Sequence, residues 1–306
     1  MNPVGKCGEL EAENKAILLQ NNLHMDPYDE KFNEMHSGPL IMTEKDILER
    51  EDVRTECVFT IDPLTARDLD DAMSCKELSD GNFEVGVHIS DVAYFLEEKS
   101  ELDEIVKLRS TSVYMVNEVF HMLPKPLCFK CSLLPGANKF AFSVFWKMTE
   151  TGEILDTRFA RTIVNSCTQL AYEHAQKIID NPDRQFHEKD FPIIHNGFTV
   201  NDIVQKVKRF HSIAQQLRDK RFKNGALKIN KPKLYFDLNG ETGAPDNYAT
   251  SILQEANFLI EEFMLMANQS TADFIYKKFP QIAILRNHQP PLKNVIMKVS
   301  KNSVHF

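Results

Sequence analysis

The feature of this 306-residue chain that most constrains its fold is the order of its periodic segments, because strand patterns come first and long helical patterns follow. Residues 140–148 and 154–164 predict a hairpin around a turn that contains Gly152. Residues 202–222 then carry apolar side chains at helical spacing, and residues 251–279 predict a long, largely apolar helix. Strands followed by helices favour an α+β fold over alternating βαβ units.

Shorter segments complete the expected architecture. Residues 83–89 alternate apolar with polar or small side chains and predict a strand, as do residues 234–238, which a glycine-rich turn follows. Residues 101–113 and 168–180 predict helices, the second ending at Asn181-Pro182.

Four aspartates lie within ten residues, directly after a predicted strand at Val58–Ile61 that Pro63 ends. They are Asp62, Asp68, Asp70 and Asp71. Carboxylates this close raise one another's pKa unless a cation lies among them. Mg²⁺ and Mn²⁺ take oxygen ligands and keep water for chemistry, whereas the spacing does not fit a calcium-binding EF-hand loop. The cluster therefore favours metal-dependent phosphoryl or phosphodiester chemistry. The alternative is a solvated acidic loop at a helix start, where Asp is common.

Charge gives a second ambiguous signal. The net charge of −8 argues against an indiscriminate nucleic-acid binder, since phosphate contact depends on Lys and Arg. Between Lys206 and Lys233, however, ten basic residues are opposed only by Asp219, a local excess of nine positive charges (ten minus one). Such a run is either a solvated helix face or a surface that follows a phosphate backbone.

Composition limits the other classes of protein. The chain has no apolar stretch long enough to span a bilayer, and its first residues lack a hydrophobic signal core, so we expect an intracellular protein. Its six scattered cysteines suit reduced thiols. Cys128 and Cys131 form one C-x-x-C pair, but no second pair completes a zinc site.

Five short motifs are specific when taken together. They are Thr60–Ala72, Val87–Val92, Met122–Pro124, Cys131–Pro135 and Ile260–Asn268. In these motifs the chain resembles the RNB catalytic domain of the RNase II family of exoribonucleases, and the likeness is greatest to its Dis3-like members. The resemblance implies a mixed, largely antiparallel sheet with packed helices. It also implies 3′→5′ hydrolysis of single-stranded RNA to nucleoside 5′-monophosphates with Mg²⁺ or Mn²⁺, in RNA decay and processing.

The resemblance also assigns roles to acidic residues. Asp62 and Asp71 match the family's metal ligands, and Asp68 matches a further contributor to the metal site. Asp70 matches the aspartate closest to the chemical step, through a second metal or the attacking water. Glu261 matches a carboxylate near the scissile end, so the implied catalytic residues are Asp70, Asp68 and Glu261.

RNA-binding residues follow from the same matches. Tyr114 and Tyr172 match aromatic residues that grip RNA near its 3′ end, although packing is the ordinary role of such a tyrosine. Ile229 stands where bacterial members place a stacking Phe. The implied partner is single-stranded RNA, with uridylated 3′ ends as a candidate subclass, and neither DNA nor a membrane. The implied location is the cytoplasm, with P-bodies as the candidate compartment.

The family pattern sets the expected domain limits. We expect a polar lead-in over residues 1–50, a partial RNB domain over residues 51–291 and a tail over residues 292–306 that does not match the family. OB and S1 domains, and a late Ser-Pro-(Ile/Leu)-Arg-(Arg/Lys)-Tyr motif whose Arg contacts the scissile phosphate, have no counterpart here. The alternative functions are therefore a non-catalytic RNA-binding relic and a fragment.

Overall fold

The computed structural model describes residues 4–227, 233–239, 245–251, 253–287, 289–290 and 292. The chain divides into two compact units, Met1–Leu265 and Met266–Phe306. Helix α8 (Glu255–Lys278) begins in the first unit and ends in the second, where the Lys278 ammonium lies over the Phe274 ring. Within the described residues no helix is both long and apolar enough to cross a membrane.

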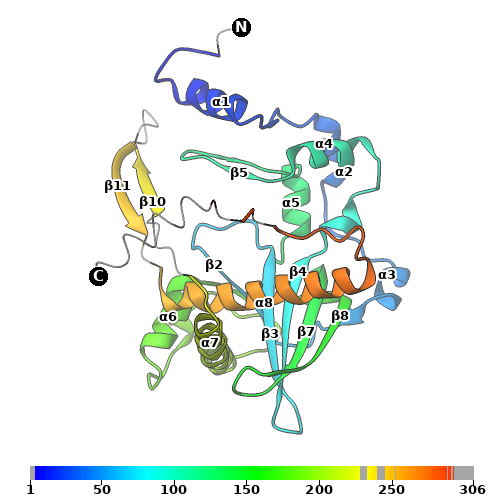
Figure 1. The fold of residues 1–306 in the computed structure, drawn as a ribbon, viewed down its shortest axis with the longest axis vertical. Coiled ribbons are helices and arrows are strands. Elements are labelled where there is room, and N and C mark those ends of the chain that lie inside the picture. The colour runs from blue at the N-terminus through cyan, green and yellow to red at the C-terminus, as the bar shows by residue number, and fades with distance from the viewer. Residues whose placement is uncertain are drawn as a thin grey trace. The chain divides into compact units, whose positions relative to one another are not determined.

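A seven-stranded sheet, with the strand order β1-β8-β7-β4-β3-β2-β9, forms the centre of the first unit (Figure 1). Its strands are β1 (Glu51–Asp52), β2 (Val58–Asp62), β3 (Asp71–Glu77), β4 (Phe83–Ser90), β7 (Asn138–Met148), β8 (Ile154–Asn165) and β9 (Thr168–Ala171). Only the outer pairs, β1 with β8 and β2 with β9, are parallel. The prediction of an α+β fold with a mixed, largely antiparallel sheet is confirmed.

The described residues outside this sheet form helices and two small hairpins. The helices are α1 (Leu10–Gln20), α2 (Glu30–His36), α3 (Glu44–Leu48), α4 (Glu101–Arg109), α5 (Lys125–Cys131), α6 (Tyr172–Asp180), α7 (Val200–Lys223) and α8, with 3-10 turns η1 (Val92–Phe95) and η2 (Glu188–Asp190). The hairpins pair β5 (Val113–Tyr114) with β6 (Val119–Phe120), and β10 (Lys233–Leu238) with β11 (Pro245–Ser251).

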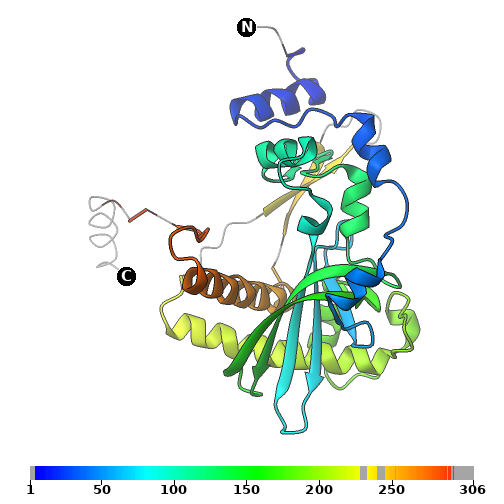
Figure 2. The ribbon, with the colours of Figure 1, turned by 90° about the vertical axis from the view of Figure 1, so that its right-hand side faces the viewer.

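The core lies between the sheet and the helices that cover it. All five residues of β2 are buried, which explains its continuous apolar pattern. Phe210 of α7 packs on Phe59 of β2 with ring centroids 5.9 Å apart, and Phe263 of α8 packs on Phe210 at 5.4 Å. Figure 2 shows α7 crossing the sheet. The predicted hairpin is β7–β8, and Gly152 in its turn has a positive φ of 74° that favours glycine.

Three predicted boundaries differ from the structure. Residues 168–171 are not helical but form β9, because they pair with β2 more than a hundred residues earlier. The helix predicted over residues 101–113 ends at Arg109, since Ser110 takes a left-handed backbone conformation and β5 begins three residues later. The helix predicted from residue 251 begins at Glu255, because residue 251 belongs to β11.

Residues 1–50, predicted to be a polar lead-in, carry three helices in their described part. Phe32 of α2 is 3% exposed and packs in one cluster with Leu127 of α5. Asp46 of α3 accepts a hydrogen bond from the Tyr94 hydroxyl at 3.0 Å. A few anchoring side chains thus tie a mostly polar segment to the rest of the first unit.

Candidate active site

The acidic loop between β2 and β3 (residues 63–70) is fixed by one buried residue. The Leu69 side chain is fully buried, its backbone N–H donates to Ser132 Oγ at 2.8 Å, and its carbonyl accepts from the Leu133 N–H at 2.8 Å. Because successive side chains of an extended segment point in opposite directions, burial of Leu69 turns Asp68 and Asp70 the other way. The loop therefore presents its aspartates away from the core.

The other two aspartates are placed by strand ends. Asp62 is the last residue of β2 and Asp71 is the first of β3, where it pairs with Ile89 of β4. The carbonyl of Asp70 accepts a hydrogen bond from the Ser90 N–H at 2.9 Å, which fixes the backbone where the loop enters β3. The sheet thus brings both ends of the acidic loop together.

Of the four carboxylates, Asp62 is in the least favourable environment for a negative charge. Its side chain is 9% exposed, and Oδ2 has no hydrogen-bond partner among the described residues. The pKa of Asp62 is raised from 3.8 to about 7, chiefly by burial; the Thr60 side chain opposes the rise, and the charges of Asp71, Asp70 and Asp68 contribute to it. A carboxyl group in this position is stabilised either by a proton or by a cation.

The neighbouring carboxylates show the same effect. Burial, followed by the charge of Asp70, raises the pKa of Asp71 to about 6. Partial burial and then the charge of Asp68 raise the pKa of Asp70, while His121 lowers it. The four aspartates therefore act on one another electrostatically, as the sequence predicted.

A hard divalent cation fits these residues chemically, because carboxylate oxygens are its preferred ligands and the orphaned Asp62 oxygen lacks a partner. Within the described chain, however, no three His, Cys, Asp or Glu side chains converge closely enough to hold an ion. The acidic loop therefore carries the charge and the donor types of a metal site.

Two predicted RNA-binding residues lie beside the acidic loop. Tyr114, on β5, is 67% exposed, and its hydroxyl donates to Asp68 Oδ2 at 3.2 Å. Tyr172 is the first residue of α6, and it follows Ala171, which pairs with Asp62 across β9 and β2. Ile229 lies outside the described residues.

Glu261 is not joined to the aspartates by any contact in the described residues. It is exposed, and its Oε1 lies 3.2 Å from Arg221 Nη2 of α7. The neighbouring Glu262 is the buried one, 4% exposed, and it accepts hydrogen bonds from the same guanidinium. The catalytic role predicted for Glu261 stays a prediction.

The basic run on α7 is largely used within the fold. Lys206 donates to the Cys75 carbonyl, and Lys208 donates to the Pro182 carbonyl. Arg209 pairs with Glu150, and Arg218 pairs with Glu255 at 3.3 Å. These contacts favour the structural explanation of the run over a phosphate-binding surface for the described residues.

Sequence reasoning missed two residues at the acidic loop. Gln169 Nε2 donates to the Ala66 carbonyl at 3.3 Å, which ties the loop to β9, and His121 lowers the pKa of Asp70. The motif Met122–Pro124 begins directly after His121 and was the available signal for it. No signal pointed to Gln169, because its segment was predicted to be helical.

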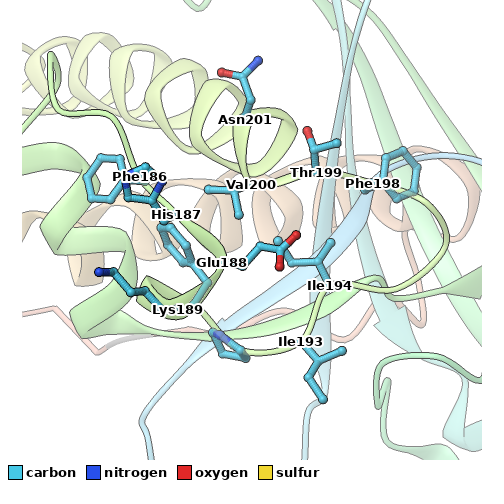
Figure 3. Close-up of a pocket in the computed structure, with 12 residues that line it drawn as sticks. Phe186, His187, Glu188, Lys189, Ile193, Ile194, Phe198, Thr199, Val200 and Asn201 are labelled. Atoms are coloured by element: carbon cyan, nitrogen blue, oxygen red, sulfur yellow. The ribbon is translucent and has the colours of Figure 1, made fainter.

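An open pocket of about 860 Å³ lies elsewhere, between the segment before α7 and the start of that helix (Figure 3). Its lining is mixed, with Phe186, Ile193, Ile194 and Val200 beside the charged Glu188 and Lys189. None of the four aspartates lines it. The pocket is therefore separate from the candidate active site.

Comparison with known proteins gives consistent matches. The RNB domain family model matches residues 50–303, past the domain limit predicted at residue 291. DIS3-like exonuclease 2 of Xenopus tropicalis is 45% identical over 294 residues, which are 95% of this chain and 35% of that protein. The inactive exonuclease DIS3L2 of Arabidopsis thaliana is 40% identical over 291 residues, which are 94% of this chain and 27% of that protein.

Among solved structures, RNase R of Mycoplasma genitalium in complex with ribose methylated single-stranded RNA superimposes with a TM-score of 0.83 and 22% identity, over 97% of this chain and 44% of that one. At this identity the match concerns the fold. The chain spans between 27% and 36% of the length of the DIS3-like relatives it matches. The likeness to Dis3-like members predicted from sequence is confirmed.

Proposed function

This chain belongs to the RNB-domain family of exoribonucleases, and on that premise we propose that it hydrolyses single-stranded RNA from the 3′ end with a divalent metal, releasing nucleoside 5′-monophosphates. The observation that carries the proposal is the buried Asp62 carboxyl, which has an unpartnered oxygen and a pKa raised to about 7 among three other aspartates. Such a group loses its electrostatic cost when a cation binds.

Asp62 and Asp71 would hold Mg²⁺ or Mn²⁺, with Asp68 and Asp70 contributing to the same site. A bound ion would lower the pKa of water and stabilise charge on the phosphate. Asp70 is the most exposed of the four and can accept a proton from an attacking water, which matches the role implied for it. The fold supplies position, since Leu69 fixes the loop that carries Asp68 and Asp70.

Tyr114 and Tyr172 are proposed to hold the RNA. Tyr114 presents an exposed ring beside Asp68, and stacking on an aromatic ring contributes about 1–3 kcal/mol per base without sequence preference. The expected substrate is therefore single-stranded RNA of any sequence, with uridylated 3′ ends as a candidate subclass. The proposed setting is RNA decay in the cytoplasm, with P-bodies as the candidate compartment.

Internally labelled single-stranded RNA tests the activity. With Mg²⁺ or Mn²⁺ the protein should release labelled mononucleotides, and excess EDTA should stop the release. Asp70→Asn should abolish turnover while the circular dichroism spectrum stays unchanged. Asp183→Asn, at an exposed site more than a hundred residues later in the chain, is the control and should keep wild-type turnover. Folded wild-type protein that releases no mononucleotide with either ion would refute the proposal.

A second candidate is RNA binding without cleavage. Two observations favour it: three acidic side chains do not converge on one point in the described residues, and a relative 40% identical is named as inactive. Binding without turnover, with an affinity that falls steeply as salt rises, would support this candidate.

A further inference from the structure

The β5–β6 hairpin contacts the acidic loop directly. The Tyr114 hydroxyl on β5 donates to Asp68 Oδ2 at 3.2 Å, and within the described residues it is the one hydrogen-bond donor to that side chain. Backbone pairing of Tyr114 with Val119 and of Val113 with Phe120 fixes the backbone of Tyr114 relative to the second strand. The orientation of the Asp68 carboxylate therefore depends on where the hairpin lies.

The hairpin is held at its tip by the N-terminal segment. Asn14 of α1 is 6% exposed, and its Nδ2 donates to Asn117 Oδ1 at 2.8 Å and to Glu118 Oε1 at 3.2 Å. The Met115 N–H closes the turn by donating to the Glu118 carbonyl at 2.9 Å. Figure 1 shows α1 above the hairpin. A buried amide more than a hundred residues away thus fixes the element that carries Tyr114.

We propose that the β5–β6 hairpin is a positioning element for Asp68, which acts through the Tyr114 hydroxyl and is anchored by Asn14. This inference rests on the proposed function, because it gives Tyr114 a second role beside stacking on RNA. Its ring takes the RNA and its hydroxyl orients a carboxylate of the metal site. Residues that hydrogen-bond a metal-binding side chain typically change metal affinity or activity about 10–100-fold when they are replaced.

Tyr114→Phe tests the hydroxyl alone, because it keeps the ring. Three quantities are measured: Mn²⁺ affinity by electron paramagnetic resonance without RNA, RNA affinity in EDTA by fluorescence anisotropy, and kcat with KM in Mg²⁺. The variant should bind Mn²⁺ about tenfold more weakly and lose about tenfold in kcat. Its RNA affinity in EDTA should stay within about twofold of wild type, because stacking is retained.

Tyr94→Phe is the matched control. Its hydroxyl also donates to an aspartate, Asp46 Oδ2 at 3.0 Å, but that aspartate lies outside the acidic loop. This variant should leave all three quantities unchanged. Tyr114→Ala should also weaken RNA binding in EDTA, since it removes the ring.

Asn14→Ala tests the anchor at the hairpin tip. It should weaken Mn²⁺ binding in the same direction as Tyr114→Phe but to a smaller extent, whereas Asn33→Ala, on the neighbouring helix α2, should have no effect.

The outcomes separate the inference from the proposed function. If the wild type is active and the Tyr114→Phe variant equals it in Mn²⁺ affinity and kcat, the inference is overturned but the proposed function is not. Equal losses in Tyr94→Phe would also overturn it, because the hydroxyl effect would then be general. Mn²⁺ binding that depends on the Tyr114 hydroxyl, without any RNA hydrolysis, would contradict only the proposed function. Wild type that binds no Mn²⁺ would overturn both.

Discussion

Replacing Asp62 by Asn should stabilise the metal-free protein, and the gain should grow with pH. The pKa of Asp62 is 3.8 without the fold and about 7 within it, chiefly because the side chain is buried. Between these two values the folded protein binds more protons than the unfolded chain, so the free energy of unfolding falls as pH rises. Above pH 7 both states are deprotonated and the loss is complete.

The size of the effect follows from the same shift. Each pKa unit corresponds to 1.36 kcal/mol, so the two units between pH 5 and the folded pKa of about 7 correspond to about 2–3 kcal/mol. Asn does not titrate and avoids this loss. Any constant cost of burying its amide is equal at both pH values and cancels when the gain at pH 5 is subtracted from the gain at pH 8.

Urea unfolding in EDTA at pH 5 and pH 8 measures this difference. Relative to wild type, the free energy of unfolding of Asp62→Asn should rise by about 2–3 kcal/mol more at pH 8 than at pH 5. Asp183→Asn, at an exposed position, serves as the control and should show no such difference. A gain for Asp62→Asn that is equal at the two pH values would refute the electrostatic argument. Added Mg²⁺ should stabilise wild type at pH 8 more than the variant, because only the wild type keeps the carboxylate ligand.

Three further predictions concern the frame around the site. Asp91→Asn should lower the free energy of unfolding, measured by urea unfolding, by about 3–5 kcal/mol. Asp91 and Arg50 form an ion pair at 2.6 Å, and their side chains are 5% and 3% exposed. The variant would leave the Arg50 charge buried without its partner. Leu69→Ala should cost about 2–5 kcal/mol and lower RNA hydrolysis through the displaced loop, whereas Leu64→Ala, at a side chain 66% exposed, should change stability by less than about 0.5 kcal/mol. Burial lowers the pKa of His88 from 6.5 to about 3. Below pH 6.5 the unfolded chain therefore takes up a proton at His88 that the folded protein does not, and the free energy of unfolding falls as pH falls towards 3. When the pH falls from 7 to 4, the free energy of unfolding of His88→Gln should therefore decrease by about 3 kcal/mol less than that of wild type, as measured by urea unfolding. Equal decreases would contradict the assignment of this loss to His88.

Some elements could be predicted from sequence because their signals are local. Strand β2 is buried along its whole length and reads as an apolar run that Pro63 ends. The β7–β8 hairpin has its turn at Gly152, and α7 keeps its apolar side chains at helical spacing. In each case adjacent residues carry the information, so the pattern survives without knowledge of the rest of the chain.

Other elements depend on distant partners. Residues 168–171 looked helical because helix α6 follows without a break, and only parallel pairing with β2 makes them a strand. The two-residue strands β5 and β6 are too short for any periodicity to show. The basic run on α7 suggested RNA, yet most of its described charges meet carboxylates or carbonyls of other elements.

The candidate site divides in the same way. The sequence by itself determined that four carboxylates lie within ten residues after a strand, since that depends only on their order in the chain. Only the tertiary structure decided that Asp62 is buried with an unpartnered oxygen, that Tyr114 reaches Asp68, and that Asn14 anchors the hairpin. Burial and long-range hydrogen bonds are properties of the packed chain, because each requires side chains from segments that sequence order keeps far apart.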